Sequence, residues 1–99
     1  MPDIGTIAAK VRSKNAGPFW VTVDIFCGTG EAFQQVSEGL STERLAKILG
    51  VSSNAIKRFD IASLNVVKFS IPRPEVQGSK ADSDMHGAAL GAFIQEIEL

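Results

Sequence analysis

The chain has 99 residues, a formal net charge of −1, and 44% hydrophobic against 21% charged residues. This composition fits one globular domain spanning residues 1–99 and excludes a disordered tail, a collagen-like segment and a coiled coil. No apolar run reaches the ~18 residues of a membrane span, the N-terminus lacks the layout of a secretory signal, and the single cysteine allows no internal disulfide. We therefore expect a cytoplasmic protein with no membrane partner, and the weak acidic charge argues against nucleic acid as a partner.

The first half of the chain predicts two strands followed by two helices. Alternating polarity predicts strands over residues 6–12 and 19–26, and helical spacing predicts helices over residues 31–40 and 41–50. The two strands are separated by the turn residues 15–18. Ser41 is a suitable N-cap for the second helix, and Gly50 is suited to end it.

The second half predicts mainly strands and a loop. Residues 55–61 fit a helix or a strand, residues 64–71 a strand, residues 77–84 a polar loop, and residues 93–99 a closing strand. Strand runs and helix runs are segregated along the chain. This order predicts an α+β fold, with a small, mostly antiparallel sheet and two helices on one face.

Residues 41–59 have the local pattern of a helix-turn-helix. Gly50 would make the turn, and Ser52 would cap a second helix that carries Lys57 and Arg58 toward phosphates. The alternative is two short helices that cover a sheet. The flanking strands and the negative net charge favour this alternative.

The block from Arg12 to Pro18 is a candidate anion site. It places two cations, a hydroxyl, an amide and a flexible glycine close together. Arg12 offers a bidentate fork for carboxylate or phosphate, and the backbone near Gly17 can form an anion-binding concavity. Lys14 could also serve as a general acid or base if it were buried. The alternative is a hairpin turn with solvated charges.

Three weaker candidates lie elsewhere. Asp82, Asp84 and His86 would share one face of an extended segment, where they could hold a divalent ion or transfer a proton, or they form an ordinary turn. Arg73 lies between two prolines and could point its guanidinium at an anion or sit in an exposed turn. Cys27 ends a strand of core character, which favours a buried and inert thiol.

An ordered set of motifs runs through the chain: Arg12-Ser13-Lys14-Asn15-Ala16-Gly17-Pro18, then Ile71-Pro72-Arg73-Pro74, Gly78, Asp82, Asp84, Gly87 and Ala88. From about residue 7 to residue 99 it resembles the small bacterial family known as domain of unknown function 4387. The tail departs from the family pattern, because Ala89–Phe93 stands where the family has Gln-Gln-His-Ala-Pro. The resemblance implies a ferredoxin-like domain, related to the one that accompanies the acyclic terpene utilisation protein AtuA.

The function implied is the small subunit of a heteromeric hydratase or lyase. Its partner would be a large AtuA-like chain, and its substrate a small organic acid or acyl thioester. The predicted substrate-binding residues are Arg12, Ser13, Gly17 and Arg73, and the predicted catalytic residues are Lys14, Asn15, Asp82 and Asp84. No metal is assigned, and the cofactor stays open. The alternatives are a helix-turn-helix DNA-binding protein, through residues 41–59, and a non-catalytic interaction module; a homodimer also stays open.

Overall fold

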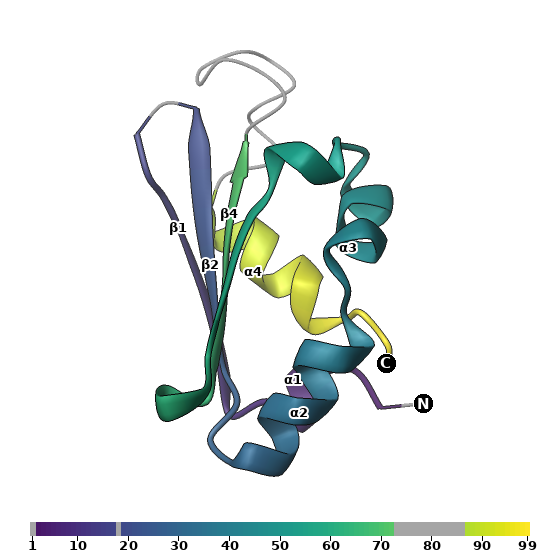
Figure 1. Ribbon diagram of the computed structural model, residues 1–99. Helices are drawn as coiled ribbons and strands as arrows, with labels where there is room; N and C mark the ends of the chain where they lie inside the picture. Colours follow the sequence, from purple (N-terminus) through teal and green to yellow (C-terminus); the bar gives the residue numbers. More distant parts are fainter. Residues whose placement is uncertain (1, 18, 73–86) are drawn as a thin grey trace.

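The computed structural model describes residues 2–17, 19–72 and 87–99 and contains a four-stranded antiparallel sheet (Figure 1). The strands are β1 (Lys10–Asn15), β2 (Trp20–Phe26), β3 (Lys57–Ile61) and β4 (Val66–Pro72), in the spatial order β1-β2-β4-β3. The helices are α1 (Ile4–Ile7), α2 (Gly30–Gly39), α3 (Thr42–Leu49) and α4 (Gly87–Gln95), with two 3-10 turns, η1 (Ser53–Ala55) and η2 (Ala62–Leu64). The predicted α+β class with an antiparallel sheet is confirmed. Within the described ranges, no helix combines the length and apolarity needed to cross a bilayer.

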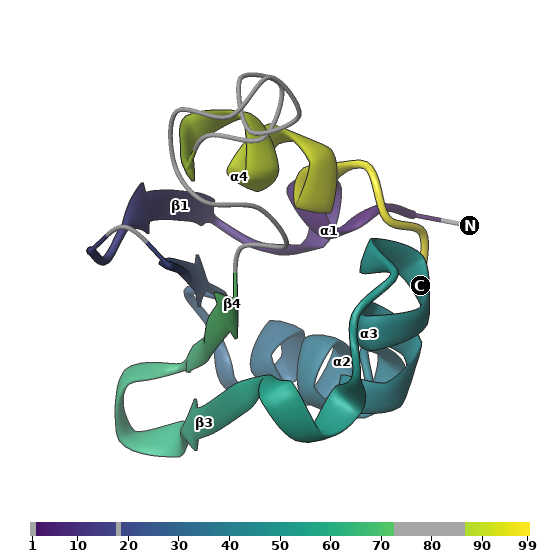
Figure 2. The same cartoon turned by 90° about the horizontal axis from the view of Figure 1, so that it is seen from above.

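The chain path contains a split βαβ unit. β2 and β3 run in the same direction, because each is antiparallel to β4, which lies between them. α2 and α3 connect β2 to β3, as in ferredoxin-like sheets. β1, which precedes β2 in the chain, pairs with β2 and forms one edge of the sheet. The two ends of the chain lie together (Figure 2), and the Leu99 amide donates a hydrogen bond to the Pro2 carbonyl at 3.0 Å. The topology is compatible with a ferredoxin-like fold.

The helices all lie on one side of the sheet and form the core with it (Figures 1 and 2). Alternate residues of the two central strands face them: Val21, Val23 and Ile25 of β2 lie opposite Ile71, Phe69 and Val67 of β4. All of these side chains are buried, together with Ile4 of α1, Val36 of α2, Leu45 of α3 and Ile94 of α4. The opposite side of the sheet is covered by none of the described elements, and this asymmetry positions the candidate site.

Local capping explains the α2–α3 pair. The Thr29 hydroxyl accepts a hydrogen bond from the Ala32 amide, and the Ser41 hydroxyl accepts one from the Arg44 amide, which starts the two helices. α3 ends at Gly50, whose φ of 73° lies in the left-handed region that favours glycine. Both predicted helices are therefore confirmed to within a residue.

Two predicted strand boundaries are wrong. The first strand begins at Lys10 and not at residue 6, because Asp3 caps a short helix through a 2.8 Å hydrogen bond from the Thr6 amide. The closing strand over residues 93–99 is replaced by α4, which ends at Gln95. Leu90 and Ile94 are buried one helical turn apart within α4, and Ile97 is buried directly after it. The helical spacing therefore outweighs the alternation that predicted a strand. The ambiguous residues 55–61 form η1 and β3, and the predicted loop over 77–84 lies outside the described residues.

The alternative of a helix-turn-helix over residues 41–59 is wrong. After α3 the chain makes the three-residue turn η1 and then enters β3, so Lys57 and Arg58 lie on a strand. The Arg58 guanidinium donates to the carbonyl oxygens of Ser37, at 2.7 Å, and Leu40, at 2.6 Å. Arg58 therefore ties β3 to the end of α2 and is engaged with protein groups, and no recognition helix exists in this segment.

Candidate anion-binding site on the open sheet face

The candidate site lies on the side of the sheet away from the helices, here called the open face. The buried residues of β2 and β4 face the helices, so the alternate residues of each strand and the residues paired with them face the other way. The open face consists of Lys10, Arg12 and Lys14 of β1; Trp20, Thr22, Asp24 and Phe26 of β2; Lys57, Phe59 and Ile61 of β3; and Val66, Lys68, Ser70 and Pro72 of β4. Side chains alternate between the two faces of a strand, so this set follows directly from the pairing.

The open face is strongly cationic in a chain that is slightly acidic. It carries five of the ten Lys and Arg residues but one of the eleven Asp and Glu residues, which is Asp24. Its formal charge is therefore +4, and the remainder of the chain carries −5. Such a distribution creates a local positive field that the net charge of −1 conceals.

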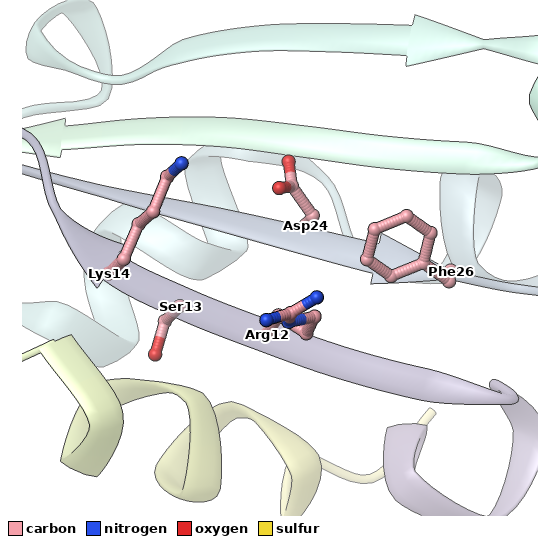
Figure 3. A pocket seen from close by; sticks show the side chains of 5 residues that line it. All are labelled: Arg12, Ser13, Lys14, Asp24 and Phe26. Carbon is pink, nitrogen blue, oxygen red and sulfur yellow. The ribbon is translucent and has the colours of Figure 1, made fainter.

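A shallow hollow of about 170 Å³ lies on this face, between β1 and β2. It is lined by Arg12, Ser13, Lys14, Asp24 and Phe26 (Figure 3). The register places Arg12 directly opposite Asp24 and Lys14 directly opposite Thr22. Since a cavity of about 150 Å³ accommodates benzene, the hollow is large enough for a small organic anion.

The polar groups of β2 in this region are incompletely paired. Asp24 Oδ1 and Thr22 Oγ1 are buried and accept or donate no hydrogen bond within the described residues. The nearest cation to Asp24 Oδ1 is the Lys68 ammonium at 3.8 Å, and both side chains of this pair are partly exposed. Asp24 therefore keeps hydrogen-bonding capacity and a negative charge at the wall of a cationic hollow.

The structure brings together two of the predicted site residues and separates others. Arg12 and Lys14 lie on the open face, two residues apart on β1. The Ser13 side chain points the other way, toward α4 (Figure 3), and its hydroxyl accepts a 2.8 Å hydrogen bond from the Gly91 amide. Ser13 thus joins β1 to α4 and contributes to the hollow without directing its hydroxyl into it.

The remaining predicted residues lie farther away. Residues 12–15 belong to β1, so the predicted anion-binding turn is mostly strand, and Asn15 occupies a register position on the helix side, opposite Val21. Gly17 sits in the hairpin connection with a φ of 80°. Arg73, Asp82 and Asp84 lie outside the described residues. Within those residues, no group of three His, Cys, Asp or Glu side chains is placed to hold a metal ion.

Asp24 and Phe26 are site residues that sequence analysis missed. The alternation of β2 places Asp24 on the polar face of its strand, but the partner strand and its register decide that Arg12 faces it. Phe26 follows the last core position of β2, and its apolar side chain gives no indication of a site in the sequence. The available signal was the Asn-Ala-Gly-Pro turn, which implies that the segments on either side form a hairpin.

Cys27 takes no part in the site. Its side chain is buried, and burial raises the pKa of the thiol above its ordinary value. A raised pKa keeps the sulfur protonated and weakly nucleophilic. The predicted burial is confirmed, and the direction of the shift agrees with an inert thiol.

These features define a small α+β domain whose uncovered sheet face carries a cationic hollow. The chain belongs to the family described as Domain of unknown function (DUF4387), whose model matches residues 4–98. This match confirms the resemblance carried by the Arg12–Pro18 block. Comparison with curated proteins and with solved structures finds no match.

Proposed function

We propose that this domain is the small subunit of a heteromeric enzyme of the hydratase or lyase type, and that the hollow binds the anionic group of the substrate. The observation that carries the proposal is the placement of Arg12 and Lys14 on one wall of a hollow in the open face. An Arg guanidinium binds carboxylate or phosphate through two parallel hydrogen bonds, and a Lys ammonium adds a mobile point charge. A small organic acid or an acyl thioester supplies such an anionic group.

The shape of the hollow supports a shared active site. It opens outward from the sheet, and its described walls come from two strands, β1 and β2. Binding sites that exclude water usually bury most of a ligand's surface. A larger subunit that lies over the open face would supply the missing walls, and the family resemblance makes a large AtuA-like chain the proposed partner.

The lining side chains suit addition and elimination next to a carbonyl group. Arg12 and Lys14 would hold the anionic end of the substrate, and Phe26 would contact its carbon skeleton. Fixed cations near a carbonyl oxygen stabilise the negative charge that develops there in the transition state. Asp24 faces the same hollow and could accept a proton from a bound water or carbon acid. Gly17 would contact a substrate that extends to the hairpin tip, whereas the predicted catalytic role of Asn15 is not part of this proposal, because Asn15 lies on the helix side of the sheet.

An NMR titration of the isotope-labelled domain with citrate and with coenzyme A tests the binding step. We expect shifts confined to β1 and β2, and a dissociation constant about tenfold weaker in Arg12→Ala, because a charge-assisted hydrogen bond is lost. Lys47→Ala is the matched control, since Lys47 is an exposed cation on α3 in the helical layer. If Arg12→Ala and Lys47→Ala weaken anion binding equally, the effect is caused by net charge alone, and the proposed site is wrong.

Turnover tests the second half of the proposal. The domain combined with an AtuA-like chain of the same organism should turn over acyl thioesters, and Arg12→Ala and Lys14→Ala should lower the rate without preventing assembly. If both variants leave assembly and turnover unchanged, the assignment of the site is wrong.

A further inference from the structure

We infer that the open face is a docking surface for a larger protein whose contact surface is acidic and carries an apolar ridge. The inference rests on the proposed function, because it names where the second subunit of that enzyme would sit. It also has its own support, in the arrangement of apolar and charged residues on this face.

Most apolar residues of the open face lie at one end of it, whereas Trp20 and Pro72 lie at the other end. The register places Phe26, Val66 and Ile61 side by side in one row across β2, β4 and β3, and Phe59 stands in the next row. Phe26 is 36% exposed and Phe59 52%. Leu64, at 68% exposure, lies in η2, which joins β3 to β4 and projects from the sheet on the side away from the helices (Figure 1). A partner that covers this end would remove several large apolar side chains from water.

The cations border this apolar end on one side and specify the charge of the partner. Lys10 shares the row of Phe26, Arg12 and Lys68 stand in the next row, and Lys14 and Lys57 stand in the row beyond it. Lys10, Arg12 and Lys14 lie along the edge strand β1, and Lys57 lies on the opposite edge strand, β3. An apolar patch bordered by polar residues is typical of protein interfaces. The formal charge of +4 on the face is complementary to an acidic surface and would steer its approach.

Two other occupants fit the face less well. A second copy of the chain stacked face to face would bring two +4 surfaces together, which like-charge repulsion opposes. Single-stranded nucleic acid stacks successive bases on aromatic rings. The exposed rings of this face, Phe26 on β2 and Phe59 on β3, are separated by β4, whose open-face residues include no aromatic ring. The Lys57 ammonium lies 5.3 Å from the centre of the third ring, that of Trp20. An acidic protein therefore accounts best for both the charge and the apolar row.

Site-specific photocrosslinking in the host organism tests this inference. The photoreactive residue p-benzoylphenylalanine replaces Phe59 on the open face or, as a matched control, Phe93 on α4, which is 44% exposed in the helical layer. Thermal melting checks that each variant folds. The expected result is one discrete, nuclease-resistant adduct from position 59 and not from position 93, heavier than a dimer of this chain, with a crosslinked peptide rich in Asp and Glu.

Charge reversal completes the test. Lys10→Glu combined with Lys57→Glu should reduce the adduct at least tenfold, while Lys47→Glu on α3 should leave it unchanged; neither Lys10 nor Lys57 lines the hollow. A nuclease-sensitive adduct, a self-dimer, no adduct, equal crosslinking at position 93, or an adduct that resists charge reversal would each overturn the inference. A charge-dependent complex that neither binds anions in the hollow nor turns over would refute the proposed function and leave the docking surface standing. Anion binding without such an adduct would overturn the docking surface and leave only the anion-binding step of the proposed function standing.

Discussion

Replacing Asp24 with asparagine should strengthen anion binding in the hollow. The substitution keeps the shape of the side chain but removes the one negative charge of the open face, directly opposite Arg12. It also releases Lys68, whose ammonium lies 3.8 Å from Asp24 Oδ1. A unit charge about 6 Å from a bound anion is worth ~0.7 kcal/mol in water and ~2.8 kcal/mol at an effective dielectric constant of 20. Because the face is open to solvent, we expect a value near the lower bound, and an affinity about three- to tenfold higher.

Isothermal titration with citrate at low salt measures this change. The matched control is Glu43→Gln, which removes the same charge from an exposed position in the first turn of α3, in the helical layer. The gain in Asp24→Asn should shrink as salt rises, since the Debye length falls to about 8 Å at physiological ionic strength. An unchanged or weaker affinity in Asp24→Asn, or an equal gain in Glu43→Gln, would show that the anion does not bind beside this carboxylate.

Three further predictions concern stability. Gly91→Ala should destabilise the domain by about 1–3 kcal/mol in urea unfolding, because the new Cβ would lie 2.6 Å from the Ser13 hydroxyl. Adding Ser13→Gly to this variant should restore much of the lost stability. An unchanged urea midpoint in Gly91→Ala would contradict this close approach of α4 to β1. Arg58→Ala should cost about 2–3 kcal/mol, because the carbonyl oxygens of Ser37 and Leu40 lose a charged donor, and chemical denaturation checks it. Hydrogen bonds at the start of α1 lower the pKa of Asp3 below its ordinary value of 3.8. The contribution of Asp3 to stability is therefore present above that pH and is lost as pH falls through the lowered pKa. The fall in melting temperature below about pH 4 should be smaller in an Asp3→Asn variant than in the unmodified domain.

Much of the fold could be predicted because its signals are local. Ser41 and Gly50 mark the ends of α3 through hydrogen bonds and a dihedral angle that involve only neighbouring residues. β2 alternates strictly between buried and partly exposed positions, so its pattern is unambiguous. β1 is harder to recognise: its open-face residues are charged and its sequence, Lys10–Asn15, has the composition of a loop. α4 is hard to recognise from the sequence because most of its residues are small. Its helical signal rests on two core contacts, Leu90 and Ile94, which lie one helical turn apart.

The candidate site could be predicted in part, for a different reason. Arg12 and Lys14 were recognised by their chemistry, and their position on one face follows from their spacing. The contribution of Asp24 depends on which strand pairs with which and in what register, and these are contacts between separate segments. The hydrogen bond between Ser13 and Gly91 joins residues 78 positions apart in the chain. No local pattern contains that information.

The meeting of the chain ends has a consequence for folding kinetics. If Leu99 were linked to Pro2 and the chain were opened in the hairpin after Asn15, β1 would follow α4, and the elements would take the order of a standard ferredoxin-like domain. The β1–β2 pairing would then close a loop of roughly eighty residues, where the present chain closes one of about four. That difference costs about 2–3 kcal/mol in loop-closure entropy. The natural connection makes this pairing a short-range contact, and such a circular permutant should fold more slowly to the same sheet.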